Sequence, residues 1–271
     1  MRFFQNLLRI FDMSMETPGL YGWFHLLWIG ISLGLAASLV HIQKRTKSEK
    51  MPFRVIFITA LVVTVLEVYK QINFSFSYKN GIAFDYGWGS FPFQFCSTPM
   101  YVGLLVGIFR KGKVHNALVA YLATYAMFAG LCVMVYPGDV FISTIGINIQ
   151  TMICHGSMLT VGIYLLATGY VKAHHKTILK ALPVFCCCAA VAIVMNEIAF
   201  YTGLLEEHYF NMFYFSPHCD PHLPVFSIVQ AAMDAPTIEI IIYILGFTLA
   251  AYLILLAAIG IKKIAKTKAP V

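Results

Sequence analysis

Charged residues are scarce in this chain. Asp, Glu, Lys and Arg together make up only 11% of its 271 residues, whereas soluble globular proteins contain about 25%. A folded chain of this size cannot cover its surface with so few charges, which excludes a soluble enzyme and a disordered protein. The formal net charge is +7, but nucleic-acid binding requires basic residues gathered on one water-facing surface. Here they lie between long apolar runs, so a nucleic-acid partner is excluded as well.

Long polar segments are also missing, which leaves no room for a soluble domain. The apolar residues, 59% of the chain, gather into seven stretches close to the roughly 20 residues that a helix needs to cross the hydrocarbon core of a membrane. These stretches cover residues 21–40, 52–73, 91–109, 114–136, 148–170, 178–202 and 236–261. They predict an all-α polytopic membrane protein with seven transmembrane helices, in one domain across residues 1–271. Residues 1–20 form a short amphipathic segment, in which we expect a surface helix at residues 3–11.

Lysine and arginine fall mainly in alternate loops. Of the 19 basic residues, 15 lie in or next to the segments that follow the first, third, fifth and seventh stretches: Lys44, Arg45, Lys47, Lys50, Arg54, Arg110, Lys111, Lys113, Lys172, Lys176, Lys180, Lys262, Lys263, Lys266 and Lys268. Cytoplasmic loops carry the excess of Lys and Arg. We therefore predict a multi-pass protein of the cell membrane, with its N-terminus outside, its C-terminus inside, and residues 203–235 as an extracytoplasmic loop.

Polar side chains inside the stretches gather toward the predicted outer side. They are His25, Glu67, Gln94, Cys96, Gln150, His155, Asn196, Glu197 and Glu239. At about 1.5 Å per residue, several of them lie roughly 8–10 Å below the outer boundary. Ionisable groups in hydrocarbon are costly and usually mark function. The common depth therefore predicts one site that opens toward the outer leaflet.

Each of these residues also has a purely structural interpretation. Polar residues at helix ends often reach water, and buried His or Asn side chains often only hold helices together. For Glu67 and Lys70, which are three residues apart on one helix face, we predict a structural ion pair. The functional interpretation depends on the whole set rather than on any single member.

Cys96 and His155 are the two residues whose chemistry fits covalent catalysis. A thiol beside an imidazole forms a nucleophile and its base, with a carboxylate or amide orienting the imidazole. Pro92 and Pro99 flank Cys96, and prolines interrupt a helix and leave backbone groups free to bind an oxyanion. Cys154 is adjacent to His155 but points about 100° away on a helix of 3.6 residues per turn, so we do not include it in the site.

A metal site is the competing interpretation for the last outer loop. His218, Cys219, Asp220 and His222 have the residue types and the spacing of zinc ligands. A zinc site needs three or four ligands on a rigid frame, however, and this loop is rich in proline and aromatic residues. We therefore predict no metal and no cofactor, and keep His218 and His222 as the alternative candidates.

Four short motifs follow one another along most of the chain. They are His25-Leu26, the Pro-x-x-x-Cys of residues 92–96, His155-Gly156 with Tyr164 after it, and an Asn-aromatic run from Asn211 to Pro217. In these motifs the chain resembles the YwaF family of bacterial integral membrane proteins, related to the vertebrate transmembrane-protein-164 acyltransferase. The resemblance implies seven helices and a cysteine-dependent transfer of a fatty acyl group between phospholipids. It also implies that Cys96 accepts the acyl group and that His155 is the catalytic histidine. The chain departs from the family pattern near Pro217, where His218 and His222 are inserted.

These observations lead to one main hypothesis and two alternatives. The main hypothesis is a membrane acyltransferase in which His155 deprotonates Cys96, with a phospholipid as acyl donor and a lysophospholipid as acceptor. A lipid hydrolase would use the same dyad with water as acceptor. A transporter or receptor would instead bind a solute or lipid in the polar cluster, without reaction at Cys96.

Overall fold

The computed structural model describes residues 9, 12–77, 82–138, 140–220, 224–232 and 235–267. These residues form a helical bundle, and their one small sheet is an antiparallel hairpin of β1 (Phe76–Ser77) and β2 (Ala83–Phe84). The helices of the bundle are α2 (Trp23–Thr46), α3 (Met51–Asn73), α4 (Thr98–Ile108), α5 (Gly112–Tyr121), α6 (Met127–Val135), α7 (Ile145–Ala167), α8 (Lys176–Tyr201) and α11 (Pro236–Thr267). The connections contain the short helices η1 (Trp88–Ser90), η2 (Phe95–Ser97), α9 (Leu204–Glu207), η4 (Met212–Tyr214) and α10 (Pro224–Ala232). The surface helix expected at residues 3–11 lies almost wholly outside the described residues.

Six helices of the described residues are long and apolar enough to cross a membrane. Five of them are α2, α3, α7, α8 and α11, and the sixth is the continuous helix Gly112–Val135, which joins α5 to α6. The predicted third span is shorter than expected, because its apolar helix covers only Phe95–Ile108. The prediction of an all-α polytopic membrane protein is confirmed, with this one segment too short to cross the hydrocarbon core alone.

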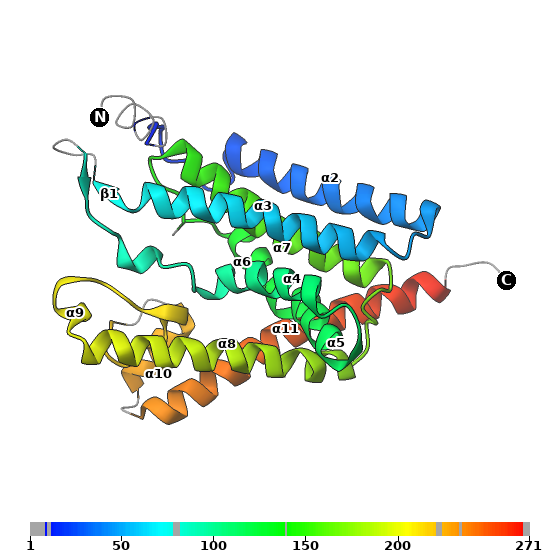
Figure 1. The fold of residues 1–271 in the computed structure, drawn as a ribbon. Helices are drawn as coiled ribbons and strands as arrows, with labels where there is room; N and C mark the ends of the chain where they lie inside the picture. Colours follow the sequence, from blue (N-terminus) through cyan, green and yellow to red (C-terminus); the bar gives the residue numbers. More distant parts are fainter. Residues whose placement is uncertain are drawn as a thin grey trace.

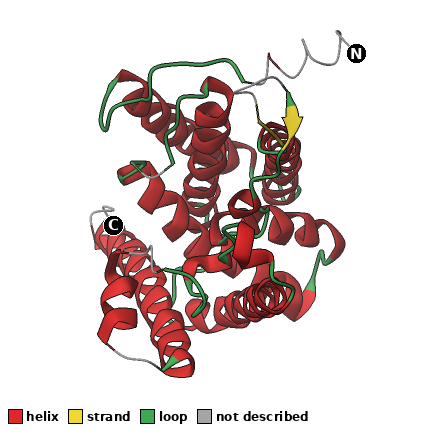
Figure 2. Ribbon diagram, turned by 90° about the vertical axis from the view of Figure 1, so that its left-hand side faces the viewer, coloured by secondary structure: helices red, strands yellow, loops and turns green. Residues whose placement is uncertain are grey.

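Helix α7 lies among the other helices of the bundle (Figure 1), which Figure 2 shows from a direction turned by 90°. In the most apolar 18-residue stretch of α7, 78% of the residues are buried inside the protein, whereas the value for α11 is 17%. It packs against α2, α3 and α6. At Gly130 of α6, an added Cβ would lie 2.6 Å from the carbonyl oxygen of His155. A small residue there lets the two backbones approach closely, as is typical of helix contacts in membranes.

The connections separate into two groups at opposite ends of the bundle. Figure 1 shows the links α2–α3, α4–α5 and α7–α8 at the same end as the C-terminus, and the hairpin, α9 and α10 at the other. The first group contains the basic segments from which the orientation is predicted. The direction of each helix therefore agrees with the predicted alternation, while the side of the membrane that each end faces stays a prediction.

The third apolar segment enters the bundle before it becomes helical. After β2 the chain passes through η1 and an extended stretch, turns at η2, and starts α4 in the middle of the molecule (Figure 1). Pro99 lies in the first turn of α4, where a missing N–H has no cost. Residues 91–94, which were predicted to be helical, are not. Cys96 therefore lies in a turn at a helix N-terminus rather than inside a continuous helix.

Candidate functional site

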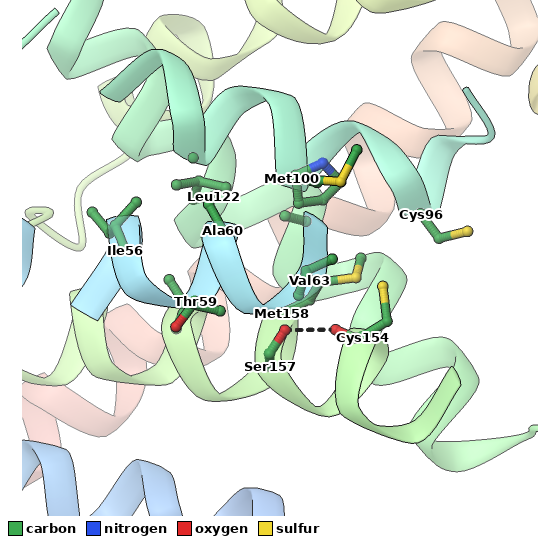
Figure 3. Close-up of a pocket in the computed structure, with 14 residues that line it drawn as sticks. Ile56, Thr59, Ala60, Val63, Cys96, Met100, Leu122, Cys154, Ser157 and Met158 are labelled. Atoms are coloured by element: carbon green, nitrogen blue, oxygen red, sulfur yellow. Dashed lines mark hydrogen bonds between the residues drawn. The ribbon is translucent and has the colours of Figure 1, made fainter. Parts of the chain in front are cut away.

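The Cys96 side chain lies at one end of a narrow cavity between α3, α4 and α7 (Figure 3). The cavity has a volume of about 30 Å³. Its other walls come from residues Leu122 and Ala126, which begin and end the π-helical segment η3 (Leu122–Ala126). Irregular turns of this kind recur at functional sites, because they shift side chains out of the regular helical register. Cys96 is half-buried as a residue, and the Ser97 side chain is placed to hydrogen-bond the sulfur.

A second thiol, that of Cys154, lines the same cavity from the opposite wall. Figure 3 shows the two cysteines near the same end, with Cys154 on α7 and Cys96 before α4. Cys154 was left out of the predicted site on helical phase, yet it lines the cavity beside Cys96. The 100° step between it and His155 is real, but α7 is surrounded by other helices, so neighbouring positions on it both face the interior.

The imidazole of His155 is buried and makes one hydrogen bond. Its Nδ1 lies 2.8 Å from the carbonyl oxygen of Thr151, one turn earlier on α7. A carbonyl only accepts, so Nδ1 carries the proton and Nε2 presents a lone pair. Within the described part of the chain, Nε2 is buried and has no hydrogen-bond partner. Such unsatisfied buried groups are rare and require an explanation.

Cys96 and His155 come from different segments, η2 and α7, and share one charged neighbour. Lys70, in the last turn of α3, interacts electrostatically with Cys96, Cys154 and His155. No hydrogen bond joins the thiol to the imidazole in the described structure, since Nε2 is unpaired and Nδ1 faces Thr151. Catalytic hydrogen bonds of this kind are often long in a free enzyme and shorten with substrate bound.

Glu67 pairs with Lys70, as the sequence predicts. The carboxylate oxygen Oε1 lies 2.8 Å from Nζ of Lys70 and accepts a second bond, also 2.8 Å, from Nε2 of Gln71. Glu67 and Gln71 line a groove of about 470 Å³ between α3, the hairpin and Pro92. The Met100 side chain lines both this groove and the cavity at Cys96.

Two amides of the predicted polar cluster, together with Asn211 of the Asn-aromatic run, hold one loop in place. Gln94 donates to the carbonyl of Asn211 and accepts from the N–H of Phe213. Asn196 binds both backbone groups of Met212, at 3.0 and 2.7 Å. Asn211 accepts the N–H of Ser216 through its own side chain. These bonds replace the backbone partners that η4 lacks, while Nδ2 of Asn211 is buried without a hydrogen-bond partner among the described residues.

Glu197, a carboxylate of the predicted polar cluster, makes no hydrogen bond to the His155 imidazole. Its carboxylate lies 3.2 Å from Nε2 of His218 in the outer loop, and His218 stacks on Phe200 with ring centroids 3.7 Å apart. The carbonyl of Thr151, rather than the Glu197 carboxylate, binds the His155 ring. His222 lies outside the described residues, and no group of three His, Cys, Asp or Glu side chains in the described ranges is arranged to hold a metal ion.

The remaining members of the cluster are buried at separate places. His25 accepts the N–H of Tyr21 at Nδ1 and bonds the Met134 carbonyl through Nε2, so both of its nitrogens are satisfied. Glu239 accepts the N–H of Ala235 and caps the start of α11. The side-chain oxygen of Gln150 accepts a long bond from its neighbour Thr151. The residues predicted to form one polar site therefore form several small networks. Cys96, His155 and Glu67 each interact electrostatically with Lys70.

Comparison with known proteins gives one match. The model of the TMEM164 family matches residues 20–259, which run from just before α2 into α11 and contain every residue of the candidate site. This match confirms the relation to transmembrane protein 164 that the motifs indicate. No curated protein and no solved structure matches the chain.

Proposed function

Because this chain belongs to the TMEM164 family, we propose that it is an integral membrane acyltransferase of the cell membrane. It moves a fatty acyl group from a phospholipid to a lysophospholipid through a thioester on Cys96. His155 is the general base. Two features of the geometry support this assignment, one at each residue.

The unpaired Nε2 of His155 carries the proposal. Its lone pair is buried and unused, while the bond from Nδ1 to Thr151 fixes the neutral tautomer in which Nε2 accepts a proton. A histidine that only holds helices together has both nitrogens satisfied, as His25 does. The difference between the two buried histidines is what a general base requires.

The position of Cys96 supplies the second support. The thiol lies at the N-terminus of α4, an 11-residue helix, where the positive end of the helix dipole favours negative charge. The Ser97 side chain and the N–H of Cys96 itself are placed to hydrogen-bond the sulfur. The same positive end faces an oxyanion that develops beside the thiolate.

In the first half-reaction, Nε2 of His155 takes the proton of the Cys96 thiol. The thiolate attacks the ester carbonyl of the donor phospholipid and forms a tetrahedral intermediate. Its collapse breaks the bond to the glycerol oxygen, which takes the proton from the imidazolium and leaves as a lysolipid. The acyl group remains on Cys96 as a thioester.

In the second half-reaction, Nε2 deprotonates the hydroxyl of the incoming lysophospholipid. The alkoxide attacks the thioester, and Cys96 leaves as a thiolate that recovers the proton from His155. Water in place of the lysolipid would give free fatty acid instead.

The test uses the purified protein in nanodiscs with a labelled phospholipid donor and an unlabelled lysophospholipid. We expect labelled acyl chains on the acceptor and an acylated Cys96 in the intact mass, both lost in Cys96→Ser and retained in Cys132→Ser. Release of free fatty acid alone would show a hydrolase. Absence of both products, with normal folding, would contradict the proposal and favour a transporter or receptor.

A further inference from the structure

The groove between α3, the hairpin and Pro92 is large enough for a ligand. Its volume of about 470 Å³ falls within the about 300–1,000 Å³ that is typical of small-molecule sites. One face of α3 lines it over about three turns, or roughly 16 Å. The residues of that face are Thr64, Glu67, Val68, Gln71, Ile72 and Ser75. The other walls come from Phe76, Phe84, Pro92, Met100 and Tyr101.

The side chains that line this groove have already used the hydrogens that they can donate. The hydroxyls of Thr64, Ser75 and Tyr101 each donate to a backbone carbonyl, at 2.8, 2.6 and 2.7 Å. Nε2 of Gln71 uses both of its hydrogens, one on Oε1 of Glu67 and one on a backbone carbonyl. Among the described residues, the side chains of the groove therefore offer hydrogen-bond acceptors and no free donor.

The strongest of these acceptors is the Glu67 carboxylate. Both of its bonds, from Lys70 and from Gln71, end on Oε1, so Oε2 has no hydrogen-bond partner among the described residues. Hydrogen bonds to an ionised acceptor are stronger than bonds between neutral groups. Because Lys70 already balances the charge of Glu67, the groove suits a neutral group that donates a hydrogen bond better than a free cation.

We propose that this groove binds a single-chain glycerolipid, the lysophospholipid acceptor, through its free glycerol hydroxyl, which donates to Oε2 of Glu67. The inference rests on the proposed function, because it identifies where the acceptor of the acyl group is recognised. A diacyl phospholipid carries ester groups at both glycerol positions, and esters only accept hydrogen bonds. Its glycerol therefore leaves Oε2 unpaired, which is unfavourable for a largely buried carboxylate.

The segment that carries Cys96 forms one wall of the groove. Pro92 and Met100, four residues before and after Cys96, both line it. The Glu67 carboxylate also interacts electrostatically with the Cys96 thiol. A lysophospholipid in this groove lies against the segment that carries the proposed nucleophile, while the apolar lining covers part of its hydrocarbon chain.

The experiment measures lipid binding to the detergent-purified protein by native mass spectrometry. The probes are lysophosphatidylcholine and its analogue with a methylated glycerol hydroxyl. A choline head group has no N–H or O–H, so the glycerol hydroxyl is the only donor. Wild type should bind the hydroxyl form at least about tenfold more tightly, as expected for a hydrogen bond to a charged group. The double variant Glu67→Gln, Lys70→Gln leaves no unpaired charge and should lose most of this preference.

Val68 and Val65 provide a matched pair of variants, because both are exposed on α3 and only Val68 lines the groove. Val68→Phe fills the groove and should weaken lysophosphatidylcholine binding at least about tenfold. Val65→Phe should leave it unchanged. Monoacylglycerol with the same chain carries the same hydroxyl without the phosphate. Tighter binding of lysophosphatidylcholine identifies the phospholipid as the ligand, and tighter binding of monoacylglycerol would overturn that assignment.

The outcomes separate this inference from the proposed function, because binding requires no reaction. Equal binding of the two lysolipid probes to wild type, or unchanged binding in Val68→Phe, overturns the inference. If acyl transfer still occurs in that case, the acyltransferase stands without this site. Selective binding with no acylation of Cys96 and no transfer would instead overturn the proposed function and leave a lipid-binding site.

Discussion

The ring of His155 donates from Nδ1 to the carbonyl of Thr151 across 2.8 Å, one turn earlier on the same helix. Because both atoms belong to α7, this bond forms wherever the helix forms and does not depend on a partner from elsewhere. It holds the ring plane and assigns the lone pair to Nε2. The proposed base is thus oriented by a backbone carbonyl, in the position that catalytic triads give to a carboxylate.

The pair formed by Glu67 and Lys70 is expected to stabilise the fold. Both side chains are largely buried, with 8% and 16% of their surfaces exposed. Glu67→Gln leaves the ammonium of Lys70 without its partner, and breaking a buried pair costs about 3 kcal/mol or more. The melting temperature in detergent should fall clearly. Adding Lys70→Gln should restore most of it, and a double variant as unstable as the single one would contradict this role.

Glu197→Gln should behave differently, because Glu197 pairs with His218 at the surface. The side chains are 37% and 23% exposed, and pairs of this kind contribute about 0–1 kcal/mol. We expect acyl transfer per folded molecule to stay within twofold of wild type, or about 0.4 kcal/mol in barrier height. The measurement is turnover normalised to folded protein. A large loss of turnover with unchanged melting would restore Glu197 as the residue that orients His155.

Cys219, in the outer loop, should react slowly and with strong pH dependence. Burial raises the pKa of its thiol above the usual value, and the sulfur lies 3.4 Å from the Phe210 carbonyl. Only the thiolate is nucleophilic, so a raised pKa means less reactive thiolate at neutral pH and faster labelling as the pH increases. Maleimide rates at Cys219 measured between neutral and mildly alkaline pH test this. A rate that levels off at or below about pH 8.5, the usual pKa of a free cysteine thiol, would contradict the raised pKa.

The predicted orientation is tested with single cysteines in a cysteine-free background. Glu206→Cys is a better outer label than Cys219 itself, because Glu206 is exposed and lies in the loop of α9. Lys47→Cys marks the opposite end, between α2 and α3. An impermeant maleimide should label position 206 and spare position 47 in intact cells. The reverse pattern would move the site to the inner leaflet.

The helices were predictable because long apolar runs have few alternatives in a membrane, where every backbone group must be satisfied internally. The third run was the exception. Pro92 and Pro99 interrupt a helix, but the apolar run around them is long enough for a transmembrane helix. Composition alone does not show that the first residues of such a run are extended rather than helical. The short α4 and its buried N-terminus depend on contacts with η3 and α3 that no local pattern contains.

The site was predictable where both partners lie on one helix, as in the Glu67–Lys70 pair, while the catalytic roles of Cys96 and His155 stay predictions. It was not predictable where the partner comes from a distant part of the chain. Glu197 and His218 are 21 residues apart, and His218 reaches Glu197 through the shape of the outer loop. Cys154 shows a second limit, since helical phase excludes a residue only when part of the helix faces lipid, and α7 is buried on nearly all sides.

The central claim is that His155 activates Cys96, and the most direct test compares modification of all seven cysteines by a lipid-like electrophile, using mass spectrometry. In wild type, Cys96 should react faster than Cys154 in the same cavity and faster than the exposed Cys132 and Cys187. In His155→Ala that advantage should disappear, with a loss of about 10²- to 10⁴-fold, the usual contribution of a general base. A Cys96 that reacts no faster than Cys132 in wild type, or equally fast without His155, would contradict the account.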